Sequence, residues 1–277
     1  MLAAGIGCCS FLLVGPTYDI QDALERGLIS VEFTSNGKSS KECVTMTTRN
    51  LSGKTFYLTV EPGYILHTVD PDAQDILITR PENILVKANS STLENLYGFC
   101  SQSTNSTPSE DSKFARGEYA SEPLRELAAY LSKNQVDPNL EQDAVWTVSS
   151  GHPVASIYEE DDPHSEDLKG FCADLMGVEM PWYNVEYGDV LDAPFIDEPL
   201  VLSGEMVYWV NTVGYADLVV LDPDGEVLVT FFEHTIRKPG ATYTQRFTFE
   251  ATNMKRGDYH FSLVLEGQVV EDQVITL

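Results

Sequence analysis

Basic side chains are scarce in this 277-residue chain, and their scarcity sets its electrostatic character. Lysine and arginine total 17 against 43 aspartates and glutamates, so the formal net charge is −26. A field of that sign repels nucleic-acid backbones and anionic membrane surfaces. We therefore expect no nucleic-acid partner, and we expect the partner to be a protein or another surface.

Short sequences typical of common active sites are also missing. The chain contains no His-Glu-x-x-His, no Gly-x-Ser-x-Gly and no Cys-x-x-Cys, which would indicate a metalloprotease, a serine hydrolase and a thiolate metal site respectively. We therefore expect a non-enzymatic protein with no catalytic residue and no metal site. A hydrolase assembled from residues distant in the sequence is an alternative, because the histidines are scattered: His67, His152, His164, His234 and His260.

The first 15 residues lack charged side chains and are too short to span a bilayer comfortably as a helix. They resemble the core of a secretory signal, although the basic segment that normally precedes such a core is missing. We expect residues 1–16 to be a signal or anchor segment and the protein to be extracytoplasmic, either secreted or at the cell surface. Gly7-Cys8 adds lipidation as an alternative.

Cysteine is sparse outside that segment, where three residues remain: Cys43, Cys100 and Cys172. In an oxidising compartment Cys43 can pair either with Cys172 or with Cys100. The alternative is that all three are buried, unreactive thiols.

Alternation of apolar and polar residues is the strongest structural signal, and it is clearest between Leu200 and Leu277. Runs of β-branched and aromatic residues with period two predict strands, and similar runs recur between residues 28 and 87. The expected fold class is mainly β: two antiparallel, Ig-like β-sandwich domains with a few short helices between them. The C-terminal strands are expected at residues 206–210, 216–221, 226–231, 242–249, 258–265 and 269–276.

Helical periodicity and charge mark the middle of the chain. Leu124, Leu127, Ala128 and Leu131 share one face of a predicted helix, a second helix is predicted up to Gly151, and acidic residues follow. We expect four segments: a signal or anchor segment (1–16), an N-terminal β-sandwich with a helical insertion (17–157), an acidic linker region (158–199) and a C-terminal Ig-like β-sandwich (200–277).

Acidic clusters are the remaining candidates for a cofactor site, because carboxylate oxygens are calcium ligands. None matches the twelve-residue calcium loop with its fixed glycine and closing glutamate. We expect hairpin turns or solvated linkers there and no cofactor, with weak calcium binding as the alternative. The clusters are residues 70–72, 159–162 and 222–225.

One cysteine and one glutamine carry the sharpest chemical motif. Phe99-Cys100 and the later Gln142-x-Ala-Val-Trp146 resemble the aromatic-Cys and Gln-x-Ala-hydrophobic-Trp motifs of bacterial surface thioester domains. The resemblance implies that Cys100 and Gln142 condense into an internal thioester shielded by Trp146, and that the protein is a covalent adhesin. The chain departs from the family in having Glu141 where Thr is usual, and a core cysteine near a tryptophan-bearing helix is the alternative.

The C-terminal segment is similar to the Ig-like domain of flagellar hook-capping proteins and to the C-terminal sorting domains of type IX secretion cargo. The matching positions are Asp222-Pro-Asp-Gly225, Pro239-Gly240, Gly257-Asp-Tyr259 and Gln268-Val-Val270, although the chain ends without the basic residue of a sorting signal. The resemblance implies a secreted bacterial protein. We expect a binding or structural module for attachment or assembly, with self-association through unpaired edges such as residues 242–249. Exposed aromatic residues in this C-terminal segment would mark a docking face.

Overall fold

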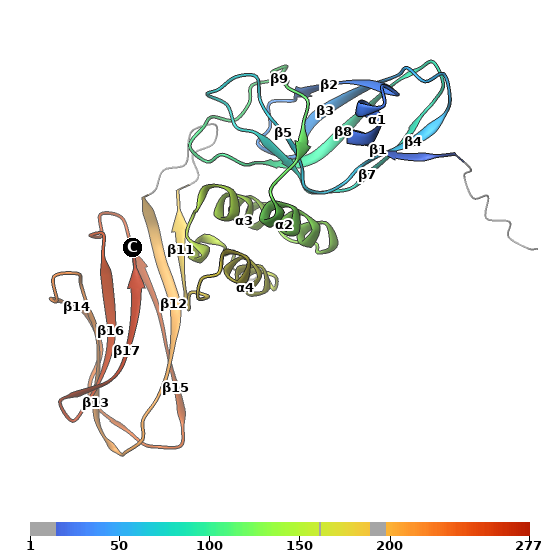
Figure 1. Ribbon diagram of the computed structural model, residues 1–277. Helices are drawn as coiled ribbons and strands as arrows, with labels where there is room; N and C mark the ends of the chain where they lie inside the picture. The colour runs from blue at the N-terminus through green and yellow to red at the C-terminus, as the bar shows by residue number, and fades with distance from the viewer. Residues whose placement is uncertain (1–14, 161, 189–197) are drawn as a thin grey trace, which may run out of the picture. The chain divides into compact units, whose positions relative to one another are not determined.

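The computed structural model describes residues 15–160, 162–188 and 198–277, and this part of the chain is mainly β, with four sheets and four α-helices (Figure 1). The expected fold class is therefore confirmed. Residues 1–14, most of the predicted signal or anchor segment, lie outside the described residues. So do residue 161 of an acidic cluster and residues 189–197 of the predicted linker region. None of the described helices is long and apolar enough to cross a bilayer.

The chain forms two compact units. The first contains the chain up to Ser101 and residues 106–135, and the second contains residues 102–105 and 136–277. The predicted linker region, residues 158–199, includes helix α4 (Ser165–Met176) and strand β11 (Tyr183–Tyr187), which both belong to the second unit.

Two sheets build the first unit. A seven-stranded sheet has the order β10-β5-β6-β8-β3-β2-β9, and a three-stranded sheet has the order β1-β4-β7. The pairings are antiparallel except for β1, which runs parallel to β4. The strands are β1 (Thr17–Asp19), β2 (Ile29–Ser35), β3 (Ser40–Asn50), β4 (Phe56–Val60), β5 (Tyr64–Leu66), β6 (Ile76–Ile78), β7 (Glu82–Val86), β8 (Ser91–Cys100), β9 (Lys113–Phe114) and β10 (Glu118–Tyr119).

Alternating burial explains why these two sheets pack together. In β4, every second residue is buried, and Phe56 and Leu58 join Phe33 of β2 and Met46 of β3 in one apolar core. Helix α1 (Ile20–Glu25) closes part of this core and begins where the Asp19 carboxylate accepts a hydrogen bond from the Gln21 N–H, which is an N-cap contact.

The predicted helices are present. Helix α2 (Glu122–Lys133) buries Leu127, Ala128 and Leu131 on the predicted face and ends the first unit. In the second unit, α3 (Pro138–Ser150) ends at Gly151, whose φ of +75° is the left-handed conformation that stops a helix at glycine. A short 3₁₀ turn, η1 (Val154–Ser156), and α4 follow.

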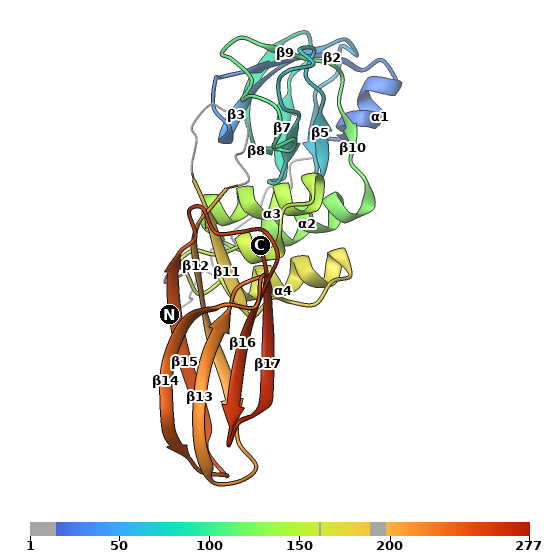
Figure 2. The same ribbon diagram turned by 90° about the vertical axis from the view of Figure 1, so that its left-hand side faces the viewer.

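An antiparallel sandwich completes the second unit, with one sheet in the order β11-β12-β15 and the other in the order β14-β13-β16-β17 (Figure 2). Met206 and Tyr208 of the first sheet and Leu218 and Phe261 of the second are buried in one core. All six predicted strands are present, and all but β16 are longer than predicted: β12 (Pro199–Trp209), β13 (Gly214–Leu221), β14 (Val227–Arg237), β15 (Thr242–Glu250), β16 (Asp258–Leu265) and β17 (Gln268–Thr276).

Candidate functional site

Cys100, the predicted thioester nucleophile, is the last residue of β8 and is fully buried in the core of the first unit. Burial is the main cause that raises the pKa of this thiol above its ordinary range, and the neighbouring Cys43 raises it further, while a hydrogen bond with Thr107 acts in the opposite direction. Cys100 is therefore a neutral thiol at physiological pH and a weak nucleophile by itself.

Gln142 and Trp146, the other predicted thioester residues, lie one helical turn apart on α3. The Trp146 ring lies 5.6 Å from the ring of His152, centroid to centroid. Since α3 belongs to the second unit and Cys100 to the first, neither unit by itself brings the sulfur to the carboxamide. The internal thioester stays a prediction.

The other two cysteines follow the expectation of buried thiols. Cys43 lies in the same core as Cys100, and Cys172 is buried in α4 of the second unit. Neither Cys43 nor Cys172 forms a disulfide with another described residue. Burial raises the pKa of each of these two thiols to about 12.

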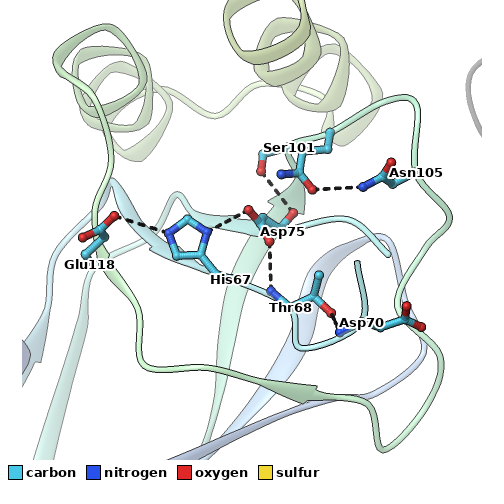
Figure 3. Close-up of polar contacts among 8 residues, drawn as sticks. His67, Thr68, Asp70, Asp75, Ser101, Asn105 and Glu118 are labelled. Atoms are coloured by element: carbon cyan, nitrogen blue, oxygen red, sulfur yellow. Dashed lines mark hydrogen bonds and ion pairs between the residues drawn. The ribbon is translucent and has the colours of Figure 1, made fainter. Parts of the chain in front are cut away.

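A polar cluster that the sequence did not reveal surrounds Asp75, a nearly buried residue before β6 (Figure 3). One carboxylate oxygen of Asp75 lies 2.8 Å from His67 Nδ1, and the other accepts a hydrogen bond from the Thr68 N–H at 2.9 Å. Its backbone carbonyl accepts from Ser101 Oγ at 3.1 Å. His67 Nε2 faces a carboxylate oxygen of Glu118 at 3.5 Å.

A carboxylate that holds His Nδ1 also orients the imidazole in catalytic Asp-His pairs. Here, however, His67 Nε2 faces the exposed carboxylate of Glu118 and not a hydroxyl or thiol that it could activate. The contacts of the Asp75 carboxylate therefore have a structural role: they fix the loop between β5 and β6. Seven residues separate His67 from Asp75 in no recognised motif, so sequence reasoning had no signal for their contact.

A second histidine contact lies in the second unit. His152 Nε2 is 2.8 Å from Ser103 Oγ, and the Ser103 N–H donates to Ser150 Oγ at 3.2 Å. Ser101 and Ser103, which follow the end of β8, are both buried. A serine hydroxyl at hydrogen-bond distance from an imidazole is the element that a dispersed hydrolase site requires.

The acidic turn at Asp222 is a hairpin turn, as expected. The Asp222 carboxylate accepts hydrogen bonds from the N–H groups of Asp224 and Glu226, each at 2.9 Å, and Gly225 has a φ of +81°. Lys255 forms ion pairs with Asp222 and Asp224 and so lies where a cation would bind. Across the described ranges, no group of three or more His, Cys, Asp or Glu side chains is placed to hold a metal ion.

The remaining candidate is a strand edge. β15 pairs with β12 in a continuous register from Val201↔Glu250 to Trp209↔Thr242. On the other side of β15, no strand of the described residues is paired with it. Residues 242–249, the predicted unpaired edge, are thus at an edge. Such an edge presents a row of backbone donors and acceptors to solvent.

Apolar side chains border this edge on the outer face of the same sheet. Val207 is 41% exposed and Trp209 is 57% exposed, and they pair across the ladder with Thr244 and Thr242 of β15. Most of the aromatic residues of the sandwich fill its interior, so Trp209 is the kind of exposed exception expected at a docking face.

Comparison with known proteins adds no family to this description. No protein-family model, no curated protein and no solved structure matches the chain.

Proposed function

We propose that this chain is an extracytoplasmic surface protein of bacterial type that attaches or assembles without catalysis, and that its sandwich self-associates by strand pairing at β15. The observation that carries the proposal is the long regular edge of β15 beside the exposed Val207 and Trp209. Strand addition takes its affinity from main-chain hydrogen bonds and its specificity from neighbouring side chains.

The register indicates which backbone groups of β15 are available. Antiparallel partners alternate between hydrogen-bonded and non-hydrogen-bonded pairs, and the Ala251 N–H bonds the Leu200 carbonyl at 2.7 Å. Continuing this alternation along β15, odd-numbered residues bond β12. The N–H and C=O groups of Thr244, Arg246 and Thr248 therefore point away from the sheet.

The other three edge strands of the sandwich are less suited to pairing, because their ladders are irregular. β14 has three register shifts against β13, β17 has one against β16, and β11 has one against β12. Bulges of this kind blunt an edge, and His234 in β14 adds a φ of +45°. The regular ladder of β15 has no such interruption.

Local charge favours a second copy of the chain as the partner. The molecule as a whole carries −26, so most approaches of two copies are repulsive. β15 itself contains one arginine, Arg246, and one glutamate, Glu250, and no other charged residue. The strand therefore carries no net charge and adds nothing to the repulsion between two copies, and added salt should strengthen their association by screening the rest.

The test is a proline at an outward-facing N–H. Thr244→Pro removes that donor while leaving the bonds to β12, because proline is tolerated where the edge faces solvent. The matched control, Thr244→Ala, removes the side chain and keeps the N–H. We expect sedimentation velocity to show concentration-dependent assembly for the wild type and for Thr244→Ala, and a monomer for Thr244→Pro with unchanged circular dichroism. A wild type that is monomeric at every concentration, or assembly that survives in Thr244→Pro, overturns the proposal.

The contact between Ser103 and His152 favours one second candidate, a hydrolase with a dispersed site. A fluorophosphonate probe that labels activated serines should then label Ser103, and labelling should disappear in Ser103→Ala and in His152→Ala. Failure of the folded wild type to label rejects this candidate.

A further inference from the structure

Lys169 is the most unusual buried side chain in the second unit. It lies on α4, is 1% exposed and is among the largest fully buried side chains of the described chain. Lysine is almost never fully buried unless a partner compensates its charge. Its Nζ donates to Asn184 Oδ1 of β11 at 2.6 Å and to Glu166 Oε1, one turn earlier on α4, at 2.9 Å.

These three side chains are the reactants and the proton carrier of an amide exchange. The amine is the nucleophile, the Asn184 carboxamide is the electrophile in direct contact with it, and the Glu166 carboxylate touches the amine. We propose that Lys169 and Asn184 form an intramolecular isopeptide bond with Glu166 as the proton carrier. This inference is independent of strand pairing at β15.

The step balances without an oxidant or a co-reactant. Glu166 accepts a proton from the Lys169 ammonium, and the neutral amine attacks Cγ of Asn184. The Nζ–Cγ bond forms and the bond from Cγ to the amide nitrogen breaks, while the proton held by Glu166 and a second proton released by Nζ both go to the leaving nitrogen. Lysine ammonium and asparagine carboxamide thus give a secondary amide and ammonium, with Glu166 regenerated as a carboxylate.

The local structure favours this chemistry over a simple hydrogen bond. Lys169 is flanked along α4 by the buried Leu168 and Cys172, and Asn184 precedes the buried Val185 on β11. The buried position of Lys169 limits water around the amine, and its contact with Asn184 holds the reacting groups at short range, which raises the effective concentration of the amine at the carbonyl. The Glu166 side chain is 66% exposed, so ammonia and the excess proton have a route to solvent.

Peptide mapping of the purified full-length protein tests the bond directly. Trypsin cleaves after Lys133, Lys169 and Arg237, with no other lysine or arginine between them. Without the bond, residues 134–169 and 170–237 appear as two peptides. With the bond, trypsin does not cleave at Lys169, and residues 134–237 appear as one peptide. Its mass is lower than the mass calculated from its sequence by one ammonia, about 17 Da from the stoichiometry of amide displacement.

A glutamate-specific protease gives the site of linkage. Cleavage after Glu166, Glu179 and Glu186 yields peptides 167–179 and 180–186 if Lys169 and Asn184 are unlinked, and one branched peptide containing both if they are linked. A thioester of Cys100 with Gln142 would lose the same mass, but it would join different peptides and would be reversed by methylamine.

Matched variants assign the proton carrier. Glu166→Gln should give an unlinked protein of full mass, whereas Asp167→Asn, which neutralises the adjacent exposed acid on the same helix, should leave the link intact. Complete cleavage of the wild type at Lys169, with both peptides at full mass, overturns the proposal. A bond that persists in Glu166→Gln overturns the role of Glu166.

Discussion

At the scale of the residue, Asp75 is the centre of its polar cluster, because its carboxylate contacts His67 Nδ1 and also accepts a hydrogen bond from the Thr68 N–H. Removing such a partner leaves the half-buried donors of His67 and Thr68 unsatisfied. We expect Asp75→Ala to lower the free energy of unfolding by about 1–3 kcal/mol in urea denaturation. Glu118→Gln, on the exposed side of His67, should change it by less than about 0.5 kcal/mol. Equal effects of the two variants would contradict this description of the cluster.

The buried thiol and phenol groups also predict how the free energy of unfolding responds to alkaline pH. Burial raises the pKa of Cys43 and Cys172 from about 9 to about 12, and the pKa of Tyr64 from about 10 to about 12. Between these values the unfolded chain releases protons that the folded chain retains, so the unfolded state binds fewer protons and stability falls as pH rises. Urea midpoints should therefore decrease from pH 9 upward, and a flat profile from pH 8 to pH 11 would contradict this.

The sequence indicated candidate residue-level chemistry only where the residues form a local motif. Phe99-Cys100 and the Gln142 motif were visible as short strings, and the hairpin turn at Asp222 was visible as turn chemistry. The contacts of His67 with Asp75 and of Lys169 with Asn184 join separate elements. No local pattern encodes such a pair, because the fold creates the proximity.

At the scale of the element, alternation predicted the sandwich strands well and missed β8. Ser91–Cys100 contains Asn95 and Gly98, which have low strand propensity, and its last three residues are buried in succession, which breaks the period of two. β8 lies between β6 and β3 inside the larger sheet. Interior position, not local sequence, determines that this segment is a strand.

Gly98 shows how tightly β8 is held. A Cβ at Gly98 would lie 2.6 Å from the Leu77 carbonyl oxygen and 2.8 Å from Ile76 Cγ2 of β6. We expect Gly98→Ala to destabilise the protein by about 1–3 kcal/mol in urea denaturation. The control is Gly170→Ala inside α4, where the nearest atom is Met180 Sδ at 3.5 Å and alanine should stabilise the helix by about 0.5–1 kcal/mol. Tolerance of Gly98→Ala would contradict the close packing.

At the scale of the whole molecule, composition and periodicity predicted a mainly-β chain with short helices but not the limits of its compact units. Trp182 comes from the predicted linker region, yet its ring packs edge-on against Phe247 at 5.6 Å and Phe261 at 5.3 Å between ring centroids. Val185 of β11 joins the same core. The acidic residues that suggested a linker do not indicate how these two apolar side chains pack.

Truncation tests whether the C-terminal sandwich folds as residues 200–277, the domain predicted from the sequence, or needs the longer segment 136–277 of the second compact unit. A fragment of residues 136–277 keeps α3, α4, Trp182 and β11 with the sandwich, so we expect cooperative thermal unfolding and dispersed amide resonances. A fragment of residues 200–277 loses Trp182 and β11 and should be unfolded or aggregated. Equal folding of the two fragments would contradict the structural role of Trp182 and β11.

Amide hydrogen exchange along β15, followed by NMR at low and high protein concentration, tests the assembly account most directly. The amides of Tyr243, Gln245 and Phe247 face β12 and should be protected at both concentrations, whereas those of Thr244, Arg246 and Thr248 should exchange rapidly in dilute solution and slow as the chain assembles. Assembly that leaves the exchange of these three outward amides unchanged would show that β15 is not the surface through which the protein associates.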